Sequence, residues 1–522
     1  MPEEIELKLA LDPHDVPRLR NTSTLKRFGS GGETRKRIIT TYYDTSSLAL
    51  RRNHIALRVR KIGRNHLQSI KIDPPNGHFP AQRAETENPI PTDRPDLECI
   101  EDPAVRRLIE KCRRGRRLLR VFSTDVVRET RPLKFAGNEI ECAIDRGVVS
   151  ARGRRVPICE LEFELQSGQP SSLLRLARRL NADIPLRLET MSKAARGYML
   201  LSGAQLSAPK ATPIQLDEGM SAREGLKAIM DSCTAHVVAG AEYATNCEDP
   251  EGVHQLRVAL RRTRAAFAII RRHAAMEVNF RIADDLRSLQ GRLGGAREWD
   301  VLVNETLVRA PRRLLSKPLS VHLNDIVEAK RAEAHGQAHD TLRDRRWTDL
   351  LLRLTHWVDA ELDNPSKERP QSKRQASDPL ATPAREFAAT VLEDAHRKVR
   401  RLGRKVRTLE PADLHRLRIR VKKLRYATEF FGSFWPDRWT KKYLSGLKDL
   451  QQVLGTYHDT TVATDLVASL GARGQNAIKP ATDRIDDWLS YEHQRQRKGV
   501  VAMWERFRKQ KLFWRRSFEE DQ

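Results

Sequence analysis

The sequence predicts an α+β protein of more than one domain, in which an antiparallel sheet with a few helices precedes an all-α, internally duplicated domain. Three observations lead to this fold class. Up to about residue 200, apolar residues recur with the period of two that is typical of strands. Beyond that point, long amphipathic helical patterns follow one another to the end. Two blocks of the helical half recur at one shared offset.

Eight short segments of alternating apolar and polar residues occupy the first 200 residues. The predicted strands are 5–11, 37–43, 56–61, 68–72, 84–90, 122–129, 139–144 and 158–165. Turn signals separate them, and helical patterns interrupt the series at 102–112 and 171–180. So many short strands favour a closed antiparallel sheet with a few helices attached.

A linker separates the two halves of the chain. Residues 203–216 carry Pro209 and Pro213 among small residues, so we expect a first domain over 1–202 and a second over 217–515. The second domain would consist of two repeats, about 217–362 and 384–515. Between them, 363–383 holds four prolines among many Ser, Lys and Arg residues, which predicts a disordered insertion.

The duplication rests on two pairs of matching blocks. The segment VHQLRV at 253–258 recurs as LHRLRI at 414–419, an offset of 415 − 254 = 161. Further along, LRSLQGRLG at 286–294 recurs as LKDLQQVLG at 447–455, and 447 − 286 is again 161. Two separated blocks at one offset indicate a duplicated helical unit with pseudo-twofold packing of two bundles.

Charge and composition limit the classes of partner. The chain has 95 Lys and Arg against 69 Asp and Glu, a net charge of +26, which predicts a polyanion: nucleic acid, a phosphate polymer, a nucleotide or an acidic membrane surface. No apolar run approaches the ~20 residues of a membrane span, and the acidic N-terminus does not resemble a secretory leader. The six cysteines form no CxxC pair and favour reduced thiols in a cytoplasmic protein.

The opening strand places Glu4, Glu6 and Lys8 on one face and apolar residues on the other. This charged face either lies in water or points inward at a ligand. Other strands repeat the pattern, with carboxylates stacked on some and basic groups on others. They carry Arg58 and Arg60, Lys71, Glu85 and Glu87, and Glu160, Glu162 and Glu164.

Any one of these strands is more easily explained as a solvated face, but the combination favours a barrel lined by both signs of charge. Clustered carboxylates suit a hard divalent cation, Mg²⁺ or Mn²⁺. Clustered Arg and Lys suit phosphate oxygens. Together they predict a site for a metal-bound oligophosphate.

This ordered set resembles the signature of the CYTH family, the triphosphate tunnel metalloenzymes. The resemblance covers roughly residues 2–200. It comprises Glu4-x-Glu6-x-Lys8, Arg58-x-Arg60, Glu85-x-Glu87, Arg128, Glu160-x-Glu162 and the segment SKAARGY at 192–198. It implies an eight-stranded antiparallel β tunnel that binds triphosphate compounds with a divalent metal.

The resemblance also implies roles for individual residues. The metal would be held by Glu4, Glu6, Glu160 and Glu162, with Asp145 and Glu87 as further acidic candidates. The phosphate chain would be bound by Lys8, Arg58, Arg60, Lys71, Arg128 and Lys193. Secondary candidates at the phosphate site are Arg35, Arg37, Arg83, Glu85 and Arg196. Asp145 would lie at the metal or orient an arginine, and Glu164 could equally be a solvent-facing strand end.

Two helices of the second half carry the same basic face. His254, Arg257, Arg261 and Arg264 fall at i, i+3, i+7 and i+10, and His415, Arg418, Lys422 and Arg425 reproduce this spacing. A zinc site is disfavoured because no second His or Cys follows at i+4. Aromatic residues make up only 6% of the chain, so base stacking by nucleic acid is disfavoured too. A linear polyanion without bases fits best.

This half resembles the CHAD domain over about 217–510. The resemblance rests on the two His-x-x-Arg-x-x-x-(Arg/Lys)-x-x-Arg helices and on Leu-Gly-x-x-x-(Asp/Glu) segments at 293–298 and 454–459. Glu298 stands where the family usually has Asp, which puts the local hydrogen bonding of the first copy in doubt. The resemblance implies binding of inorganic polyphosphate.

Taken together, the sequence resembles bacterial CYTH-CHAD inorganic triphosphatases. We expect metal-dependent hydrolysis of inorganic triphosphate in a cytoplasmic protein, with association with polyphosphate granules as a further expectation and no membrane or sequence-specific nucleic-acid partner. One alternative is the adenylate cyclase or thiamine triphosphate chemistry of the same fold, since the tunnel residues would serve both. The other is a polyphosphate-binding adaptor without catalysis, against which the intact carboxylate set argues.

Overall fold

The structure, a computed structural model of the 522-residue chain, describes residues 3–73, 80–203, 206–274, 276, 278–311, 313–363, 379–471 and 478–515. The chain divides into two units. The first comprises the residues up to Ala208 together with Arg343–Asp359, and the second comprises Pro209–Leu342 together with the chain from Ala360 onward. Each unit is described separately below.

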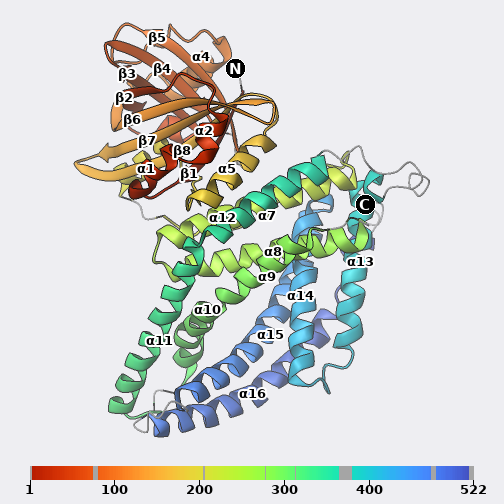
Figure 1. The fold of residues 1–522 in the computed structure, drawn as a ribbon. Coiled ribbons are helices and arrows are strands. Elements are labelled where there is room, and N and C mark those ends of the chain that lie inside the picture. The colour runs from red at the N-terminus through yellow and green to blue at the C-terminus, as the bar shows by residue number, and fades with distance from the viewer. Residues whose placement is uncertain are drawn as a thin grey trace. The chain divides into compact units, whose positions relative to one another are not determined.

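Eight antiparallel strands of the first unit close into a barrel (Figure 1). The pairing order is β5-β4-β3-β2-β6-β7-β8-β1, and β1 closes the ring by pairing with β5. The strands are β1 (Glu3–Ala10), β2 (Thr34–Asp44), β3 (Ile55–Ile62), β4 (Asn65–Ile72), β5 (Ala81–Ile90), β6 (Leu119–Phe135), β7 (Asn138–Ala151) and β8 (Arg154–Ser167). The predicted fold class and all eight predicted strands are confirmed, and a two-residue strand β9 (Arg187–Leu188) adds to β1.

Several strands are longer than predicted. β6 continues to Phe135, because pairing with β7 persists through Thr130 and Arg131, where the apolar alternation has ended. Inside a barrel, polar side chains find partners across the lumen, so a strand need not stop where its hydrophobic pattern stops.

The barrel carries short helices between and after its strands. They are α1 (Val16–Arg20), α2 (Ser23–Phe28), α3 (Ala49–Arg52), α4 (Pro103–Arg113), α5 (Ser171–Asp183) and α6 (Lys193–Ser202). Only α4 and α5 were predicted as helices. The first three span one or two turns and are too short to show a helical period. α5 packs against β1 and β8, where Leu7 and Leu9 are fully buried on the outer face of β1.

Helix α12 (Arg345–Val358) also belongs to the first unit, although it follows most of the first helical repeat in the chain. It packs along α5. The Arg178 guanidinium of α5 lies 2.9 Å from the Asp349 carboxylate, and the Thr348 hydroxyl donates to the Leu186 carbonyl at 2.6 Å. The domain boundaries 1–202 and 217–515 therefore stay a prediction. The contacts additionally assign α12, which lies within the predicted second domain, to the first unit.

The second unit is helical (Figure 1). Its longer helices are α7 (Ala222–Asn246), α8 (Pro250–His273), α9 (Phe280–Arg292), α10 (Gly294–Val301), α11 (Lys317–Arg343), α13 (Ala384–Gly403), α14 (Pro411–Phe431), α15 (Asp437–Gly471) and α16 (Lys479–Phe507). Helix α15 runs unbroken for 35 residues, whereas the first copy breaks at Leu293 into α9 and α10. The first copy has Gly295 where the second has Thr456, and glycine is the poorer helix former by up to about 1 kcal/mol.

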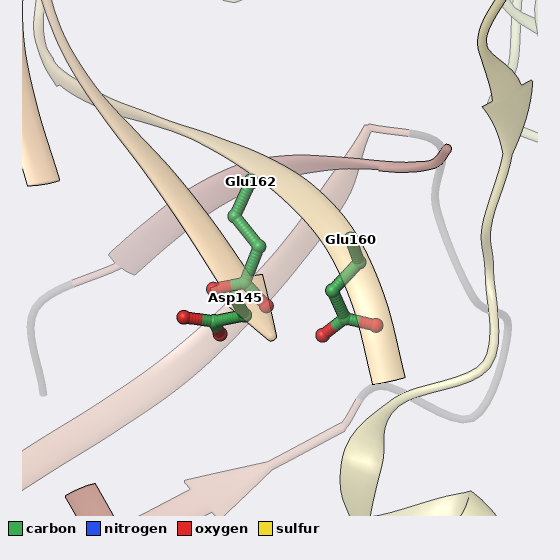
Figure 2. A group of neighbouring side chains, drawn as sticks. All are labelled: Asp145, Glu160 and Glu162. Atoms are coloured by element: carbon green, nitrogen blue, oxygen red, sulfur yellow. The ribbon is translucent and has the colours of Figure 1, made fainter. Parts of the chain in front are cut away.

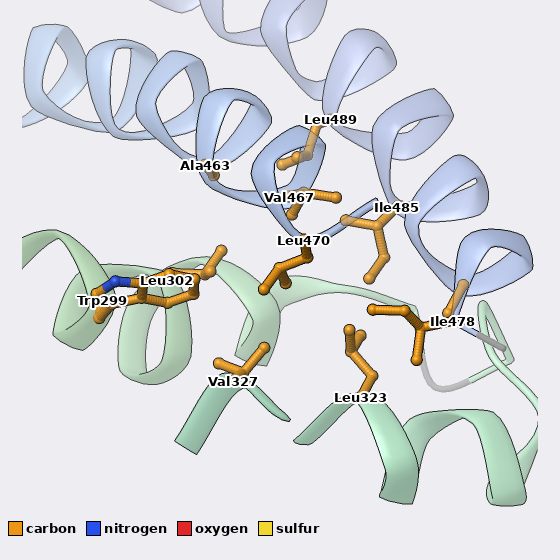
Figure 3. Packing of buried hydrophobic residues seen from close by; sticks show 11 residues of the cluster. Trp299, Leu302, Leu323, Val327, Ala463, Val467, Leu470, Ile478, Ile485 and Leu489 are labelled. Atoms are coloured by element: carbon orange, nitrogen blue, oxygen red, sulfur yellow. The ribbon is translucent and has the colours of Figure 1, made fainter. Parts of the chain in front are cut away.

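The two copies share a hydrophobic core (Figure 3). The first copy contributes Trp299, Leu302, Leu323 and Val327. The second contributes Ala463, Val467, Leu470, Ile478, Ala481, Ile485 and Leu489. Each buried aliphatic side chain of this kind stabilises the fold by roughly 1.5–3 kcal/mol, so the copies stabilise each other.

The predicted disordered insertion, 363–383, lies for the most part outside the described residues. At its end, Pro379–Ala381 forms one turn of 3₁₀ helix before α13 begins. Among the helices that the structure describes, none combines the length and apolarity needed to cross a bilayer.

Candidate functional site

The interior of the barrel is a charged cavity of about 250 Å³. Glu4, Glu6 and Lys8 of β1 line it, whereas Leu7 and Leu9, on the opposite face, are fully buried outside. The charged face of the opening strand therefore points inward, which settles the alternative that the sequence left open.

Acidic groups outnumber basic groups in this lining. The basic side chains are Lys8, Arg58, Arg60, Lys71, Arg83, Arg128 and Lys193. The carboxylates are Glu4, Glu6, Asp73, Glu85, Glu87, Glu141, Asp145, Glu162 and Glu164. Nine carboxylates against seven bases leave a negative excess, so a polyanion entering the cavity would be repelled unless bound cations or protons compensate.

Three carboxylates form a buried acidic cluster (Figure 2). Asp145 of β7 and Glu160 of β8 are paired across the ladder, and Glu162 follows two residues along β8. Each offers an oxygen, and these oxygens lie within 4.8 Å of one another. Neither oxygen of Glu160 makes a hydrogen bond, although the side chain is fully buried. Oxygen donors so placed fit a hard divalent cation such as Mg²⁺ or Mn²⁺.

The Lys193 ammonium lies among these three carboxylates. Its Nζ is 2.7 Å from Asp145 Oδ2 and 2.9 Å from Glu162 Oε1, and it also contacts Glu160 Oε1. Burial opposes its charge, but the carboxylates outweigh burial and hold the pKa of Lys193 well above its usual value. A divalent cation bound by these carboxylates would compete with Lys193 for the same oxygens.

The three carboxylates titrate differently. Burial raises the pKa of Glu160, because Lys193 offsets it only in part. Burial also acts on Asp145 and Glu162, but there the cations prevail: Lys193 and Arg128 hold both pKa values below the usual range. Glu160 is therefore the least ionised of the three, and bound cations would favour its charged form.

Glu4, Glu6 and Glu87, also predicted as metal ligands, lie among basic groups rather than in the acidic cluster. Glu4 accepts from Lys71 at 2.6 and 2.9 Å, and burial raises its pKa to about 7 despite that ammonium. Glu6 lies 3.0 Å from Lys8; burial opposes its ionisation, but Lys8 and the neighbouring Lys71 outweigh it and lower the pKa of Glu6 to about 2. Glu87 pairs with Arg60.

The predicted phosphate-binding bases are all brought into the cavity, and carboxylates hold their positions. Arg58 donates to Ser69 Oγ at 2.6 Å and to Glu85 Oε1 at 2.8 Å. Arg128 donates twice to Asp145, at 2.8 and 2.6 Å. Asp145 thus both orients an arginine and lies in the acidic cluster, so the two alternatives for this residue are compatible.

Three secondary candidates lie outside the cavity. Arg35 and Arg37 have side chains 68% and 67% exposed, and Arg37 pairs with Asp125 at 2.6 Å. Ile38 and Thr40 of the same strand line the lumen, so the odd-numbered positions of β2 face outward and the expectation for both arginines is corrected. Arg196 lies behind the acidic cluster, 3.6 Å from Glu160. Arg83 and Glu85 do line the cavity.

The sequence analysis did not predict two carboxylates that line the cavity, although the alternation of side chains along a strand would have identified both. Asp73 directly follows β4, two residues after Lys71, and it pairs with Arg83 at 2.9 Å. Glu141 is in step with Asp145 on β7. Once one residue of a strand is known to face inward, every second residue is a candidate.

Helix α6 positions Lys193 at its first residue. Ser192 caps the helix by accepting from the Ala195 amide. The Tyr198 hydroxyl donates to the buried Asp44 carboxylate at 2.9 Å. A Cβ on Gly197 would lie 2.1 Å from the Phe122 ring, so only glycine permits this close approach to the barrel. These contacts fix the helix and thus its leading ammonium.

In the second unit, helices α8 and α14 bring parts of their basic faces together. Arg261 Nε lies 3.4 Å from the Tyr426 hydroxyl on the other helix. Arg261 also lowers the pKa values of Arg418 and Lys422, after the larger effect of burial. Arg257, Arg261, Arg418 and Lys422 of the two faces thus lie close enough to influence one another, and that the whole faces meet stays a prediction. We call the group Arg257, Arg261, Arg418 and Lys422 the basic cluster; His254, Arg264, His415 and Arg425 flank it along the same two helices.

Few negative charges compensate the basic cluster. Burial, Arg418 and Arg261 together lower the pKa of Lys422 to about 6, and burial with Arg261 lowers that of Arg257 to about 10. Asp459 approaches Arg418 only to 3.6 Å. The buried Nε atoms of Arg257 and Arg418 make no hydrogen bond. Such under-compensated cations are costly, and an anionic ligand would relieve the cost.

Two imidazoles flank the basic cluster in the second copy. The Nδ1 atoms of His415 and His458 lie 3.3 Å apart. Burial and Arg418 lower the pKa of His458 to about 3, and burial also lowers the pKa values of His254 and His415. These histidines are therefore largely neutral at neutral pH.

Comparison with known proteins gives two family matches. The CYTH domain family matches residues 2–198 and the CHAD domain family matches residues 228–468. The inorganic triphosphatase of Haemophilus influenzae is 29% identical over 207 residues, which are 38% of this chain and 55% of that protein. The chain thus spans about half the length of that relative.

Two solved structures are also similar. The crystal structure of the CHAD domain from the plant Ricinus communis has a TM-score of 0.50 and 25% identity, and the match covers 58% of this chain and 97% of that one. A Hippeastrum protein described as a putative adenylyl cyclase with a dominant triphosphatase activity matches 40% of this chain and 98% of its own, at 19% identity and a TM-score of 0.29. That second likeness is too weak to carry an argument.

Proposed function

This chain consists of a CYTH domain over residues 2–198 followed by a CHAD domain over residues 228–468, and from this premise we propose that the first domain hydrolyses inorganic triphosphate and the second binds inorganic polyphosphate. CYTH tunnel enzymes depend on a metal, and the relative from Haemophilus influenzae is an inorganic triphosphatase. Both support a triphosphatase in general terms, and the choice of substrate rests on the cavity.

The observation that carries the choice is the small, charged lumen. A cavity of about 250 Å³ accommodates a short phosphate chain but leaves little room for a nucleoside. Tyr42 is the one aromatic ring in the described lining, and it is 2% exposed, so it offers no face for a base. Inorganic triphosphate therefore fits better than ATP or thiamine triphosphate.

The residues suggest how the reaction proceeds. Arg58, Arg60 and Arg128 would bind the phosphate chain and neutralise the charge that develops on its oxygens. A water molecule attacks the terminal phosphorus, the bond to the bridging oxygen breaks, and orthophosphate and pyrophosphate leave. A lining carboxylate takes the water's proton; Glu4, with a pKa of about 7, is matched to that task near neutral pH. Mg²⁺ or Mn²⁺ held by Asp145, Glu160 and Glu162 would polarise the scissile group.

The CHAD proposal rests on the basic cluster and its missing counter-charges. A linear phosphate polymer supplies many anionic oxygens without bases, and the chain has few aromatics to stack with bases. A cytoplasmic location and association with polyphosphate granules belong to the same proposal.

Phosphate release tests the enzymatic part. Triphosphate, ATP and thiamine triphosphate would each be assayed with Mg²⁺ and with Mn²⁺, and triphosphate should be the best substrate. Glu162→Gln should reduce turnover by about a hundredfold or more, since it removes a buried charge at the acidic cluster. The matched control is Asp125→Asn, a carboxylate on the outer face of the barrel.

Two results would decide against this proposal. Formation of cyclic AMP from ATP at a higher rate than triphosphate hydrolysis would favour the cyclase alternative. No turnover of any substrate, with polyphosphate binding intact, would favour the adaptor.

A further inference from the structure

A second cavity lies on the outside of the barrel domain, between α3, α4 and the turn that follows α4. Its volume is about 390 Å³. The two cavities share no lining residue. This outer pocket is lined by Ala49, Arg52, Asn53, Leu108, Lys111, Cys112, Arg114 and Arg116.

The rim of the outer pocket is positively charged and uncompensated. It carries four basic side chains and no carboxylate. Arg116 donates to Ser47 Oγ at 2.6 Å, whereas the side chains of Arg52, Lys111 and Arg114 have no hydrogen-bond or ion-pair partner within the described parts of the chain. The nearby Glu110 is already engaged, since Arg113 donates to both its oxygens at 2.6 and 2.7 Å.

The other four lining residues of the outer pocket are uncharged: Ala49, Asn53, Leu108 and Cys112. Ala49 is buried, Cys112 is half-buried, and Leu108 is among the large apolar side chains that remain exposed, at 36%. Apolar residues beside several basic groups suit a ligand with an uncharged body and a charged end rather than a bare ion. Arginine guanidinium groups add a preference for planar bodies, on which they stack.

The backbone at Arg114 forms the end of helix α4. Arg114 adopts a left-handed conformation, with φ = +50°, at the C-cap of α4. Gly115 follows it with φ = +71°. A left-handed conformation costs a residue with a side chain on the order of 1 kcal/mol more than glycine. The Arg114 amide donates to the Glu110 carbonyl at 2.9 Å, so this conformation ends the helix in a common way and fixes where the Arg114 side chain begins.

We propose that the outer pocket binds a nucleoside phosphate, with its phosphates on Arg52, Lys111 and Arg114 and its base over Leu108 and Cys112. Charge-assisted hydrogen bonds from two or three basic groups orient the phosphates. The volume lies in the range of roughly 300–1,000 Å³ found for small-molecule sites. This site is independent of the tunnel and of the triphosphatase proposal.

Because Cys112 lines the outer pocket, its alkylation rate reports directly whether a ligand occupies the pocket. The full-length protein would be treated with iodoacetamide, with and without ADP, in the presence of EDTA. The alkylation rate of each cysteine would be followed by peptide mass spectrometry. ADP at ten times its Kd should slow the alkylation of Cys112 by about tenfold, because about nine-tenths of the sites are then occupied. Cys99 and Cys247, also half-buried, serve as internal references that should not change.

Matched variants identify the groups responsible. Arg52→Ala with Arg114→Gly removes two rim charges and also relieves the left-handed backbone, so the variant should fold and lose the protection. The control variant, Arg107→Ala with Arg117→Ala, removes two exposed charges of the same segment that do not line the pocket. In this variant ADP should still protect Cys112.

Three outcomes would overturn the proposal. The first is an alkylation rate of Cys112 that ADP does not change. The second is protection that persists in the rim variant. The third is protection of Cys112 by pyrophosphate that equals protection by ADP, which would make the pocket an anion site without a nucleoside. None of these results depends on activity in the tunnel, so the triphosphatase proposal stands or falls separately.

Discussion

Lys193 is the residue on which the charge balance of the acidic cluster depends. Its ammonium contacts all three of the buried carboxylates, which come from two adjacent strands. Removing it would take away one of the cations that offset these buried charges, although Arg128 and Arg196 would remain, and breaking a buried ion pair typically costs about 3–5 kcal/mol.

We expect Lys193→Met to lower the melting temperature and to make it depend on divalent cations. Mg²⁺ or Mn²⁺ should raise the melting temperature of the variant more than that of the wild type, because the cation takes over the role of the ammonium. The measurement is thermal unfolding with and without the metal. Lys134→Met, at a side chain 70% exposed, is the control. An equal metal effect in the variant and the wild type would contradict the assignment of the acidic cluster to a cation.

At the scale of single residues, the sequence best predicted which side chains of a strand share one face. Glu4, Glu6 and Lys8 could be placed on one face from period two alone, and the same rule would have found Asp73. The prediction for Arg35 and Arg37 was wrong because the sequence of β2 does not reveal which of its residues face the lumen. Basic residues occupy consecutive positions at its start, so either alternate set could have been the inward one. Which carboxylates meet in space depends on strand pairing, which a single strand pattern does not contain.

At the scale of elements, helix α6 determines the position of Lys193. The helix is held by its cap, by Gly197 against Phe122, and by the hydrogen bond from Tyr198 to Asp44. Tyr198 is itself not part of the described lining of the tunnel, so we regard it as a positioning residue.

Tyr198→Phe should lower the unfolding free energy by about 1–3 kcal/mol and reduce kcat several-fold, because the buried Asp44 loses a donor and α6 loses an anchor. KM for triphosphate should change less than kcat, since the phosphate-binding arginines are untouched. Tyr43→Phe is a matched control: that hydroxyl also makes a hydrogen bond, to the Asp93 carbonyl, but does not hold α6. Equal losses of kcat in both variants would mean that the effect is one of general stability.

The paired helices α8 and α14 predict that polyanion binding depends on pH. Lys422 faces Arg418, Arg261, Arg425 and Asp459, and burial with the first two lowers its pKa to about 6. Its unfolded-state pKa is about 10.4, so between these values the unfolded chain binds more protons and stability rises with pH. A bound anion acts in the opposite sense, because it favours the charged form.

Affinity for long-chain polyphosphate should therefore increase as pH falls from 8 towards 6, with proton uptake on binding. Lys422→Arg keeps its charge throughout, so it should bind about tenfold more tightly at pH 8, where one charge-assisted contact contributes about 1.5 kcal/mol, and show a shallower pH dependence. Titration calorimetry at several pH values measures both. Lys441→Arg, on an exposed side chain, is the control. An unchanged pH slope in Lys422→Arg would refute the assignment.

At the scale of the whole molecule, the two units are discontinuous in sequence. The chain leaves the first unit after Ala208, returns to it for Arg343–Asp359, and leaves again. The eight strands and the duplicated bundle could be predicted, since both rest on periodicity within short segments. The partner of α12 could not, because an amphipathic helix reveals that it has an apolar face and not which surface covers that face.

Leu350→Asp in α12 should therefore destabilise the barrel unit, although the residue lies in the sequence of the second domain. Leu350 is fully buried, and a buried carboxylate there should cost about 3–5 kcal/mol. Differential scanning calorimetry of the full chain should show two unfolding transitions. The variant should lower the midpoint temperature of the same transition whose midpoint triphosphate raises. Leu323→Asp, in the core of Figure 3, should lower the other transition. The reverse pattern would place α12 in the helical unit.

The return of α12 also has a consequence for synthesis on the ribosome. The barrel unit is complete only when residue 359 has been made, 359 − 208 = 151 residues after its first segment ends. At roughly 5–20 residues per second, this interval is about 8–30 s. During that time the apolar surface of α5 that α12 covers stays exposed on the nascent chain, and the first helical repeat emerges beside it. The protein is thus expected to need a chaperone at that stage, or to fold its barrel last although its strands are made first.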